Sequence, residues 1–316
     1  MISVIVPVYN GEKTIAACLE ALLNQTKKPD EIIVVDDGST DKTKEIVEKF
    51  KAVRLIEQAH RGPAAARNLG AKNAKGDMLF FIDADCRADA NWVLEMGRSF
   101  EDKTISGVQG RYKTEQKGLV ARFVQLEIED RYDRMKKHGR IDFIGSYSAG
   151  YRKEAFARCG GFDESFTTAS GEDPELSFKL SRSGHKMVFN DSAIVYHNHA
   201  ASLGAYLRQK FWRAYWRVLL YRKHPSKMAH ESYTPQAVKV QILALCSFAL
   251  FFILSFFLQY ALYLSILSLL FLAVFTLPLS FKNFRKDKTV AVSTPVISIF
   301  RTIVFTLGLI CGAIRL

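Results

Sequence analysis

The sequence predicts an α/β domain with a mostly parallel sheet, followed by an interfacial helix and C-terminal transmembrane helices. Two observations predict this: short apolar strands alternate with helical patterns up to residue 82, and an apolar run without any charge begins at residue 242. Such alternation is typical of right-handed βαβ units. The expected elements are the strands Ile2–Val8, Glu31–Val35, Val53–Glu57 and Asp77–Ile82 and the helices Glu12–Gln25, Lys42–Phe50 and Pro63–Ala74.

The charge-free run extends from Ile242 to Phe281, about twice the length that one membrane-spanning helix needs. Gln259 and Tyr260 lie near its middle, so we expect a tight transmembrane hairpin over residues 239–281. A buried pair of core helices is the alternative, but core helices rarely lack all charge over such a length. A lipid bilayer is therefore an expected partner.

Basic residues flank both ends of this run, and the expected turn has none, which favours a cytoplasmic location for both ends. The net charge of +12 could indicate nucleic acid, but many basic residues adjoin apolar segments, so anionic headgroups explain them better and no nucleic-acid partner is expected. Met1 leads directly into a strand without a basic leader. We therefore expect a multi-pass protein of the cell membrane with a cytoplasmic first domain.

Two further segments are expected to contact the membrane. Residues 201–238 contain the basic, aromatic stretch Leu203–Tyr221, which is typical of an amphipathic interfacial helix. The stretch Thr289–Leu316 is apolar but contains Arg301, so residues 289–316 either span the membrane with Arg301 facing protein or lie in the interface. The five cysteines have no close spacing, which indicates neither disulfides nor a zinc site and fits a reducing compartment.

The triplet Asp83-Ala84-Asp85 directly follows an expected strand. Two carboxylates at positions i and i+2 can face one hard cation, and Mg²⁺ and Mn²⁺ prefer oxygen ligands and share a diphosphate readily. A surface turn with acidic helix caps is the ordinary alternative, because short acidic triplets are common.

Asp36 and Asp37 follow another strand. An ordinary turn before a capped helix would explain Ser39, Thr40 and Asp41, but not two adjacent acids at a strand end. A carboxylate there can accept hydrogen bonds from a base edge or a ribose.

Glu172 and Asp173 precede Pro174 and a helical pattern. Acids are favoured at a helix start, which is the preferred interpretation of this pair taken alone. The functional alternative is a general base, because a sugar hydroxyl needs a carboxylate to take its proton. His197 and His199 follow the strand-like Ala193–Tyr196 on one face; they fit a metal or phosphate contact and a plain polar strand end equally well.

Six short motifs, in this order and spacing, resemble the family-2 glycosyltransferases, which have a GT-A-type nucleotide-diphospho-sugar fold. The resemblance covers residues 1–200, the expected catalytic domain. The motifs are Ser3-Val4-Ile5-Val6-Pro7-Val8-Tyr9-Asn10, Val34-Val35-Asp36-Asp37-Gly38-Ser39-Thr40-Asp41, Ala65-Ala66-Arg67-Asn68-Leu69-Gly70, Phe81-Ile82-Asp83-Ala84-Asp85, Gly160-Gly161-Phe162-Asp163 and Gly171-Glu172-Asp173.

The resemblance implies a role for each candidate residue. Asp85 would bind a Mn²⁺ or Mg²⁺ ion on the diphosphate, with Asp83 facing the ribose or the metal and His197 completing the metal site. Asp173 would be the base of an inverting displacement, and Glu172 would position the acceptor. Pro7, Val8 and Tyr9, together with Asp37, would hold the nucleobase. The other nucleotide-sugar-binding residues implied are Asp36, Arg67, Asp83 and Ala84.

The expected function is a hexosyltransferase that uses a UDP- or GDP-sugar donor and a membrane lipid acceptor, as polyprenyl- and dolichyl-phosphate sugar synthases do. Processive polysaccharide synthases of the family carry Gln-x-x-Arg-Trp, whereas Gln209-Lys210-Phe211-Trp212-Arg213 has its last two residues reversed, which disfavours that alternative. A non-catalytic membrane scaffold is disfavoured because the acidic motifs are intact. A nucleotidyltransferase is disfavoured because the residues after Val8 are not glycine-rich. A homo-oligomer is left open.

Overall fold

The computed structural model describes residues 1–166, 168, 170–228 and 235–315. The chain divides into two compact units, each described here by itself. The first unit comprises Met1–Glu115 and Tyr132–Asn198, and the second comprises Gln116–Arg131 and His199–Leu316. Residues 116–131, which the resemblance assigns to the catalytic domain, therefore group with the C-terminal helices.

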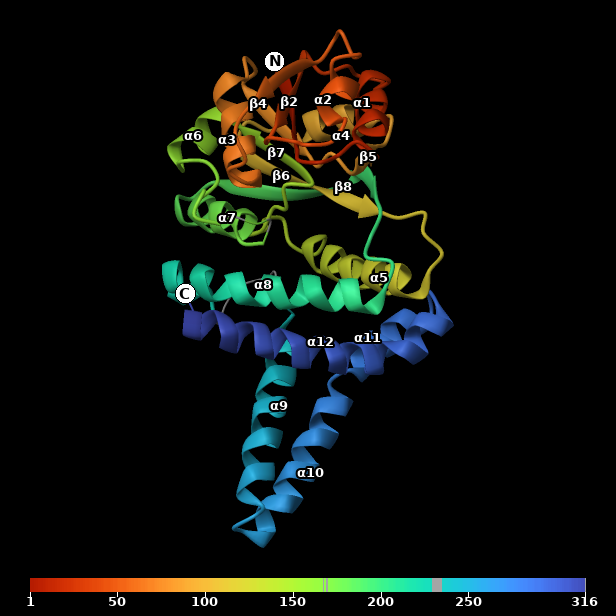
Figure 1. The fold of residues 1–316 in the computed structure, drawn as a ribbon, viewed down its shortest axis with the longest axis vertical. Helices are drawn as coiled ribbons and strands as arrows, with labels where there is room; N and C mark the ends of the chain where they lie inside the picture. Colours follow the sequence, from red (N-terminus) through yellow and green to blue (C-terminus); the bar gives the residue numbers. More distant parts are fainter. Residues whose placement is uncertain (167, 169, 229–234, 316) are drawn as a thin grey trace. The chain divides into compact units, whose positions relative to one another are not determined.

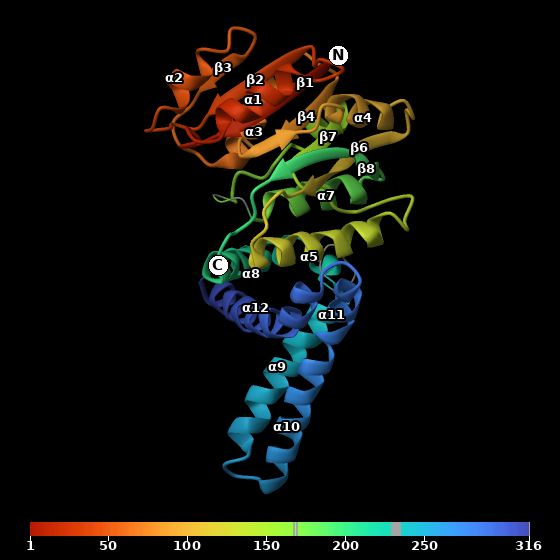
Figure 2. The same cartoon turned by 90° about the vertical axis from the view of Figure 1, so that its right-hand side faces the viewer.

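The first unit is built on a mixed sheet, whose described strands have the order β3-β2-β1-β4-β7-β6-β8-β5 (Figure 2). The pairs β1–β2, β2–β3, β1–β4 and β6–β8 are parallel, and the pairs that involve β7 or β5 are antiparallel. The strands are β1 Ile2–Val8, β2 Glu31–Asp36, β3 Arg54–Glu57, β4 Met78–Ile82, β5 Cys86–Ala88, β6 Ile105–Lys113, β7 Ser148–Arg152 and β8 Lys186–His197.

The expected βαβ half of this sheet is confirmed, with helices that begin or end up to three residues inside the expected bounds. Because crossovers are right-handed, α1 and α2 cover one face of β1, β2 and β3, and α3 covers the other. Gly70 of α3 lies against Ile5 and Val35, where a Cβ atom would come within 2.5 Å of the Ile5 side chain. The helices of this unit are α1 Ile15–Leu23, α2 Thr43–Val47, α3 Pro63–Asn73, α4 Trp92–Ser99, α6 Lys153–Arg158 and α7 Glu172–Arg182.

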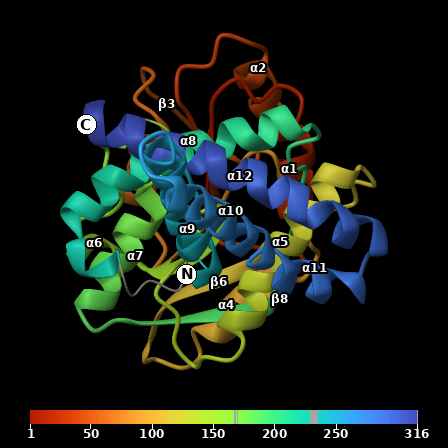
Figure 3. The same cartoon turned by 90° about the horizontal axis from the view of Figure 1, so that it is seen from below.

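The second unit is helical (Figure 1). α9 and α10 form a hairpin joined by residues 255–258, and α12 runs alongside α8 (Figures 1 and 3). The elements are α5 Leu119–Met135, whose last four residues belong to the first unit, then α8 Leu203–Lys223, a 3₁₀ turn Pro225–Lys227, α9 Gln236–Leu254, α10 Gln259–Val274, α11 Leu277–Phe284 and α12 Lys288–Arg315.

Within the described residues, three helical segments are long and apolar enough to cross a membrane: Gln236–Leu254, Gln259–Phe284 and Lys288–Arg315. The first two form the expected hairpin and expose large apolar side chains such as Phe256, Phe257 and Tyr260. Contiguous apolar surface of this extent indicates contact with lipid or protein.

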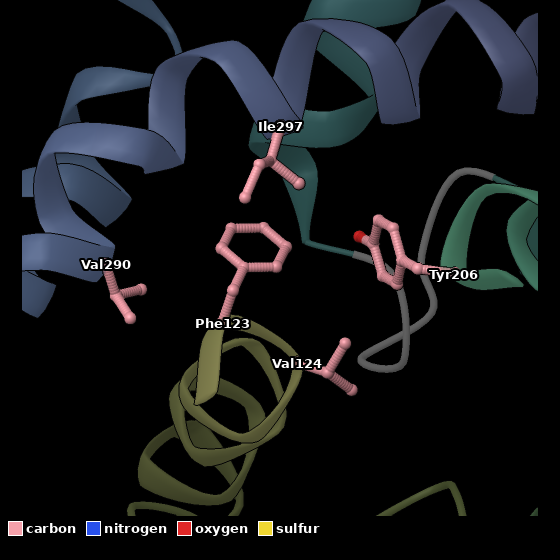
Figure 4. Close-up of a cluster of buried hydrophobic side chains, with 5 residues drawn as sticks. All are labelled: Phe123, Val124, Tyr206, Val290 and Ile297. Atoms are coloured by element: carbon pink, nitrogen blue, oxygen red, sulfur yellow. The ribbon is translucent and has the colours of Figure 1, made fainter. Parts of the chain in front are cut away.

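A buried apolar cluster joins the other helices of the second unit (Figure 4). Phe123 of α5 points toward Ile297 of α12, with Val290 beside it, and Tyr206 of α8 lies across from Val124 (Figure 4). α5, α8 and α12 therefore share one small core.

Candidate active site

The candidate residues lie at the carboxyl ends of strands in the first unit. Tyr9 follows β1, Asp36 ends β2, Asp83 follows β4 and His197 ends β8. The chain proceeds from β1 to β2 and β3, and then returns to place β4 on the opposite side of β1. An open α/β sheet binds ligands at such a reversal of strand order. The adjacent carboxyl ends of β1 and β4 are therefore where a ligand site is expected.

Asp37 organises the loop that leads into α3. Its Oδ1 accepts hydrogen bonds from the Gln58 side chain at 2.6 Å and from the Arg61 backbone at 2.8 Å, and its Oδ2 accepts from Gly62 N at 2.9 Å. Gly38 has a φ of 79°, and a Cβ atom there would lie 3.0 Å from His60 N. Both carboxylate oxygens of Asp37 are therefore used to hold this loop. A ligand would meet the loop and not the carboxylate itself.

The loop carries an aromatic pair that sequence reasoning did not single out. His60 stacks on Tyr9 with ring centroids 4.1 Å apart, and its Nδ1 lies 2.9 Å from Asp37 Oδ2. Tyr9 is 48% exposed, whereas Pro7 and Val8 are buried in β1. Of the three residues expected to hold the nucleobase, only Tyr9 offers its side chain, and His60 joins it. The sequence could have indicated His60, because it follows β3, the strand next to β2 in the sheet.

Arg67 on α3 links two of the candidate acids. The buried guanidinium donates from Nη2 to Asp83 Oδ1 at 2.7 Å and from Nη1 to Glu172 Oε1 at 3.0 Å. Burial alone would lower the pKa of Arg67, but the surrounding carboxylates outweigh it and raise this pKa. Glu172 also accepts from the backbone of Ser170 and Gly171, so its buried carboxylate is fully engaged. Glu172 therefore anchors Arg67 and the start of α7.

Asp173 differs from its neighbour. Its Oδ2 accepts from Ser146 N at 3.0 Å, but its buried Oδ1 has no hydrogen-bond partner among the described residues. Burial, followed by the negative charge of Glu172, raises the pKa of Asp173 to about 7. A carboxylate with a free oxygen and a pKa near neutrality is matched to proton abstraction at physiological pH.

Asp85 and His197 approach each other because β5 pairs with β8. The register places Cys86 opposite His197, which brings His197 Nε2 to 3.3 Å from Asp85 Oδ2. His197 also stacks on Tyr112, which stacks on Tyr147. Partial burial opposes the effect, but the hydrogen bond and charge of His197 lower the pKa of Asp85.

These two groups fit a divalent cation bound to a diphosphate, because such an ion needs only one or two protein ligands besides phosphate oxygens. Among the described residues, no cluster of three or more metal-ligating side chains occurs. Oδ1 of Asp83 accepts a hydrogen bond from Arg67. Ala84 lies beside the loop after β1, because a Cβ atom added to Gly11 of that loop would be 4.0 Å from Ala84 Cβ.

The remaining expectations are resolved differently. Asp36 Oδ1 accepts from Ser39 N at 3.0 Å, so its buried carboxylate holds the turn. The expectation that His197 and His199 share one strand face is wrong, because β8 ends at His197. His199 lies in the second unit, where its Nε2 is 2.9 Å from Gln125 Oε1. His199 is held by glutamine side chains, since its backbone N–H also donates to Gln116 Oε1 at 2.6 Å.

This mixed sheet, with carboxylates where the strand order reverses, defines the GT-A class of fold. The sequence model described as glycosyl transferase family 2 matches residues 3–160, which is half of the 316 residues, and the chain belongs to this family.

Among its curated relatives, the pre-mycofactocin glycosyltransferase of Mycobacterium tuberculosis is 28% identical over 237 residues, 72% of this chain and 49% of that protein. The uncharacterized glycosyltransferase EpsJ of Bacillus subtilis is 30% identical over 219 residues, 64% of this chain and 62% of the relative. The chain thus spans 49% of the length of the first of these relatives.

Two solved structures show the shared fold. The mannosyltransferase PcManGT of Pyrobaculum calidifontis, in complex with GDP-Man and Mn²⁺, is 19% identical with a TM-score of 0.59 and is matched over 99% of this chain and 86% of that chain. GalNAc-T7 with UDP, GalNAc and Mn²⁺ is 19% identical with a TM-score of 0.52, over 74% of this chain and 52% of that chain.

Proposed function

We propose that this chain transfers a sugar from a UDP- or GDP-sugar to a hydroxyl group of a membrane-bound acceptor, with inversion at the anomeric carbon. The single observation that carries the proposal is Asp173, whose buried Oδ1 has no partner among the described residues and whose pKa is raised to about 7. The structures of PcManGT with GDP-Man and Mn²⁺ and of GalNAc-T7 with UDP and Mn²⁺ support the choice of donor.

The proposed chemistry divides the acids into three roles. Asp173 takes the proton of the acceptor hydroxyl as the oxygen of that hydroxyl attacks the anomeric carbon and the bond from this carbon to the diphosphate breaks. Arg67 holds Asp83 and Glu172, and burial, followed by the negative charge of Glu172, keeps the proton affinity of Asp173 high. Asp85 and His197 would hold Mn²⁺ or Mg²⁺, which neutralises charge on the departing diphosphate.

The raised pKa also bears on the acceptor. A phosphate acceptor is already an anion at neutral pH and needs no base, whereas a sugar hydroxyl does. We therefore favour a lipid-linked saccharide over a polyprenyl phosphate. The membrane location of the acceptor is supported by the apolar helices Gln236–Leu254 and Gln259–Phe284 of the same chain.

The test is donor binding by the purified full chain in detergent. UDP- and GDP-sugars would be screened by calorimetry with Mn²⁺, with Mg²⁺ and with a chelator, on wild type and Asp85→Ala. We expect one nucleotide to bind with a metal, and Asp85→Ala or the chelator to weaken it at least tenfold. The matched control is Asp191→Ala, an acid paired with Arg111 on β6.

Absence of binding for every donor, by protein that remains folded, would overturn the transferase proposal and favour a non-catalytic scaffold. Binding that is unchanged in Asp85→Ala would instead refute the proposed metal site. The class of acceptor is then determined by measuring sugar transfer to a lipid-linked saccharide and to a polyprenyl phosphate. Transfer to the polyprenyl phosphate alone would overturn our choice of a hydroxyl acceptor.

A further inference from the structure

α12 has an inverted distribution of polarity. Its exposed side is a continuous stripe of large apolar side chains at spacings of three or four residues. The members of this outer stripe are Val292, Val296, Phe300, Ile303, Leu307, Ile310 and Ile314. Its buried side is mixed: besides the apolar Val290, Ala291, Ile297 and Phe305 and the glycines Gly308 and Gly312, it carries the polar residues Thr294, Ser298, Arg301, Thr302 and Thr306. A helix facing water has the opposite arrangement, so the outer stripe requires an apolar surrounding.

The buried side of α12 is fixed by a polar network around Arg301. Its Nη1 donates to Glu127 Oε1 of α5 at 2.7 Å, and its Nη2 donates to Gln241 Oε1 of α9 at 2.8 Å. Lys210 of α8 donates to the other oxygen of Glu127 at 2.8 Å. Arg301 is thus compensated by protein groups and has no need to reach water or lipid headgroups.

The same network shows which part of the hairpin axis lies beside the middle of α12. Gln241 is the sixth residue of α9, roughly 8 Å from its start at 1.5 Å per residue. Its Nε2 donates to the carbonyl of Phe275, just after the end of α10. The midpoint of α12 therefore lies near the basic end of the hairpin, whereas a third parallel span would have its midpoint beside the middle of α9.

Contacts along its length hold α12 on its neighbours. Near its start, Asn283 of α11 donates to Thr294 Oγ1 at 3.2 Å. Toward its end, Gly308 and Gly312 let its backbone approach α8, since Cβ atoms there would come within 2.4 and 2.5 Å of the carbonyls of Phe211 and Tyr215. Figures 1 and 2 show α12 lying across the direction of α9 and α10, and Figure 3, where the hairpin is seen along its length, shows the same.

We propose that α12 does not cross the bilayer but lies in the membrane–water interface, with the outer stripe in contact with lipid acyl chains. The occupant of this surface is the bilayer itself, because the stripe continues from a hairpin that is long and apolar enough to span. Arg285, Lys286 and Lys288 adjoin the start of α12, and Arg315 ends it, as expected where a helix meets headgroups. This inference concerns membrane attachment and does not depend on the proposed reaction.

Topology is the first test. The full chain, with a protease-cleavable tag at each end, would be reconstituted in sealed vesicles of phosphatidylcholine and phosphatidylglycerol at three to one. With the hairpin as the membrane crossing, the two tags lie on the same side of each vesicle and are cleaved to the same fraction. If α12 is a third span, the tags lie on opposite sides and their cleaved fractions sum to one, which would overturn the proposal.

Depth along α12 is the second test and separates lipid from other occupants. Nitroxide labels at Val292→Cys, Phe300→Cys, Leu307→Cys and Ile314→Cys would be measured by power saturation in the same vesicles. Cys159, Cys246 and Cys311 would be replaced by Ala because they are not buried, whereas the buried Cys18 and Cys86 should not label and would be kept. We expect four similar depths of about 5–10 Å, with a control label at Leu250→Cys on α9 much deeper.

Two patterns would contradict this. Depths that pass through the bilayer midplane near Phe300, about 15 Å deep, would mean that α12 spans. Labels shielded from lipid-soluble oxygen, with spin–spin broadening between chains, would mean that a second copy covers the outer stripe.

Discussion

Arg67 in the first unit and Arg301 in the second are buried arginines that donate to carboxylate oxygens, and the clusters around them differ in their balance of charge. Arg67 lies among Asp83, Glu172 and Asp173, so negative groups are in excess. Arg301 and Lys210 share Glu127, so positive groups are in excess. In both, the arginine Nε lacks a hydrogen-bond partner among the described residues.

The pKa values of the two acids are shifted in opposite directions. In the first cluster, burial and the charge of Glu172 raise the pKa of Asp173 to about 7, which leaves a group that can exchange a proton. In the second, burial acts to raise the pKa of Glu127, but Lys210 and Arg301 outweigh it and keep this pKa low. Similar residues therefore give a carboxylate with a pKa near neutrality in one unit and a carboxylate held in its charged form in the other.

The largest expected effect is that of Asp173→Asn. Removing the base should lower kcat by about 10²- to 10⁴-fold while donor affinity stays within about twofold, because the amide keeps the shape but cannot accept the proton. Single-turnover transfer and calorimetric donor binding measure the two quantities. Glu154→Gln, an exposed acid paired with Arg158, is the control. Equal losses of transfer and donor binding would show that Asp173 contributes to the pocket and not to proton transfer.

The next effect is structural and falls on the second cluster. Glu127→Gln leaves Arg301 and Lys210 buried without their common counterion, which should cost about 3–5 kcal/mol of stability. Thermal unfolding in detergent, followed by circular dichroism, measures it. Glu115→Gln, which removes an exposed pair with Arg87, should change stability by at most about 1 kcal/mol. Equal melting temperatures for the two variants would refute the contrast between the clusters.

The smallest effect concerns the aromatic pair. His60→Ala removes the ring that stacks on Tyr9, so donor affinity should fall roughly three- to tenfold with kcat at saturating donor unchanged. Titration of the nucleotide measures it, with the exposed His138→Ala as control. Unaltered affinity would mean that this pair does not contact the nucleobase.

The sequence predicts the parallel half of the sheet because each βαβ unit there is local, and it places Asp36 and Asp83 at one edge for the same reason. It does not predict that Arg67 bonds to Glu172, since 105 residues separate them and no periodicity reports such a contact. It likewise leaves β5, β6 and β7, which form the antiparallel pairs β5–β8, β6–β7 and β4–β7, unassigned. The position of residues 116–131 in the second unit depends on Glu127 meeting Arg301, 174 residues away.

The most direct test of the contrast is the pH dependence of single-turnover transfer by the wild-type chain. A base is active when deprotonated, so a raised pKa near 7 predicts a rate that rises about tenfold per pH unit below 7 and levels off above it. The raised pKa thus costs activity as the pH falls. A profile that is flat from pH 5 to pH 9 would contradict the account, because Asp173 would then titrate like an ordinary carboxyl group or take no part in the reaction.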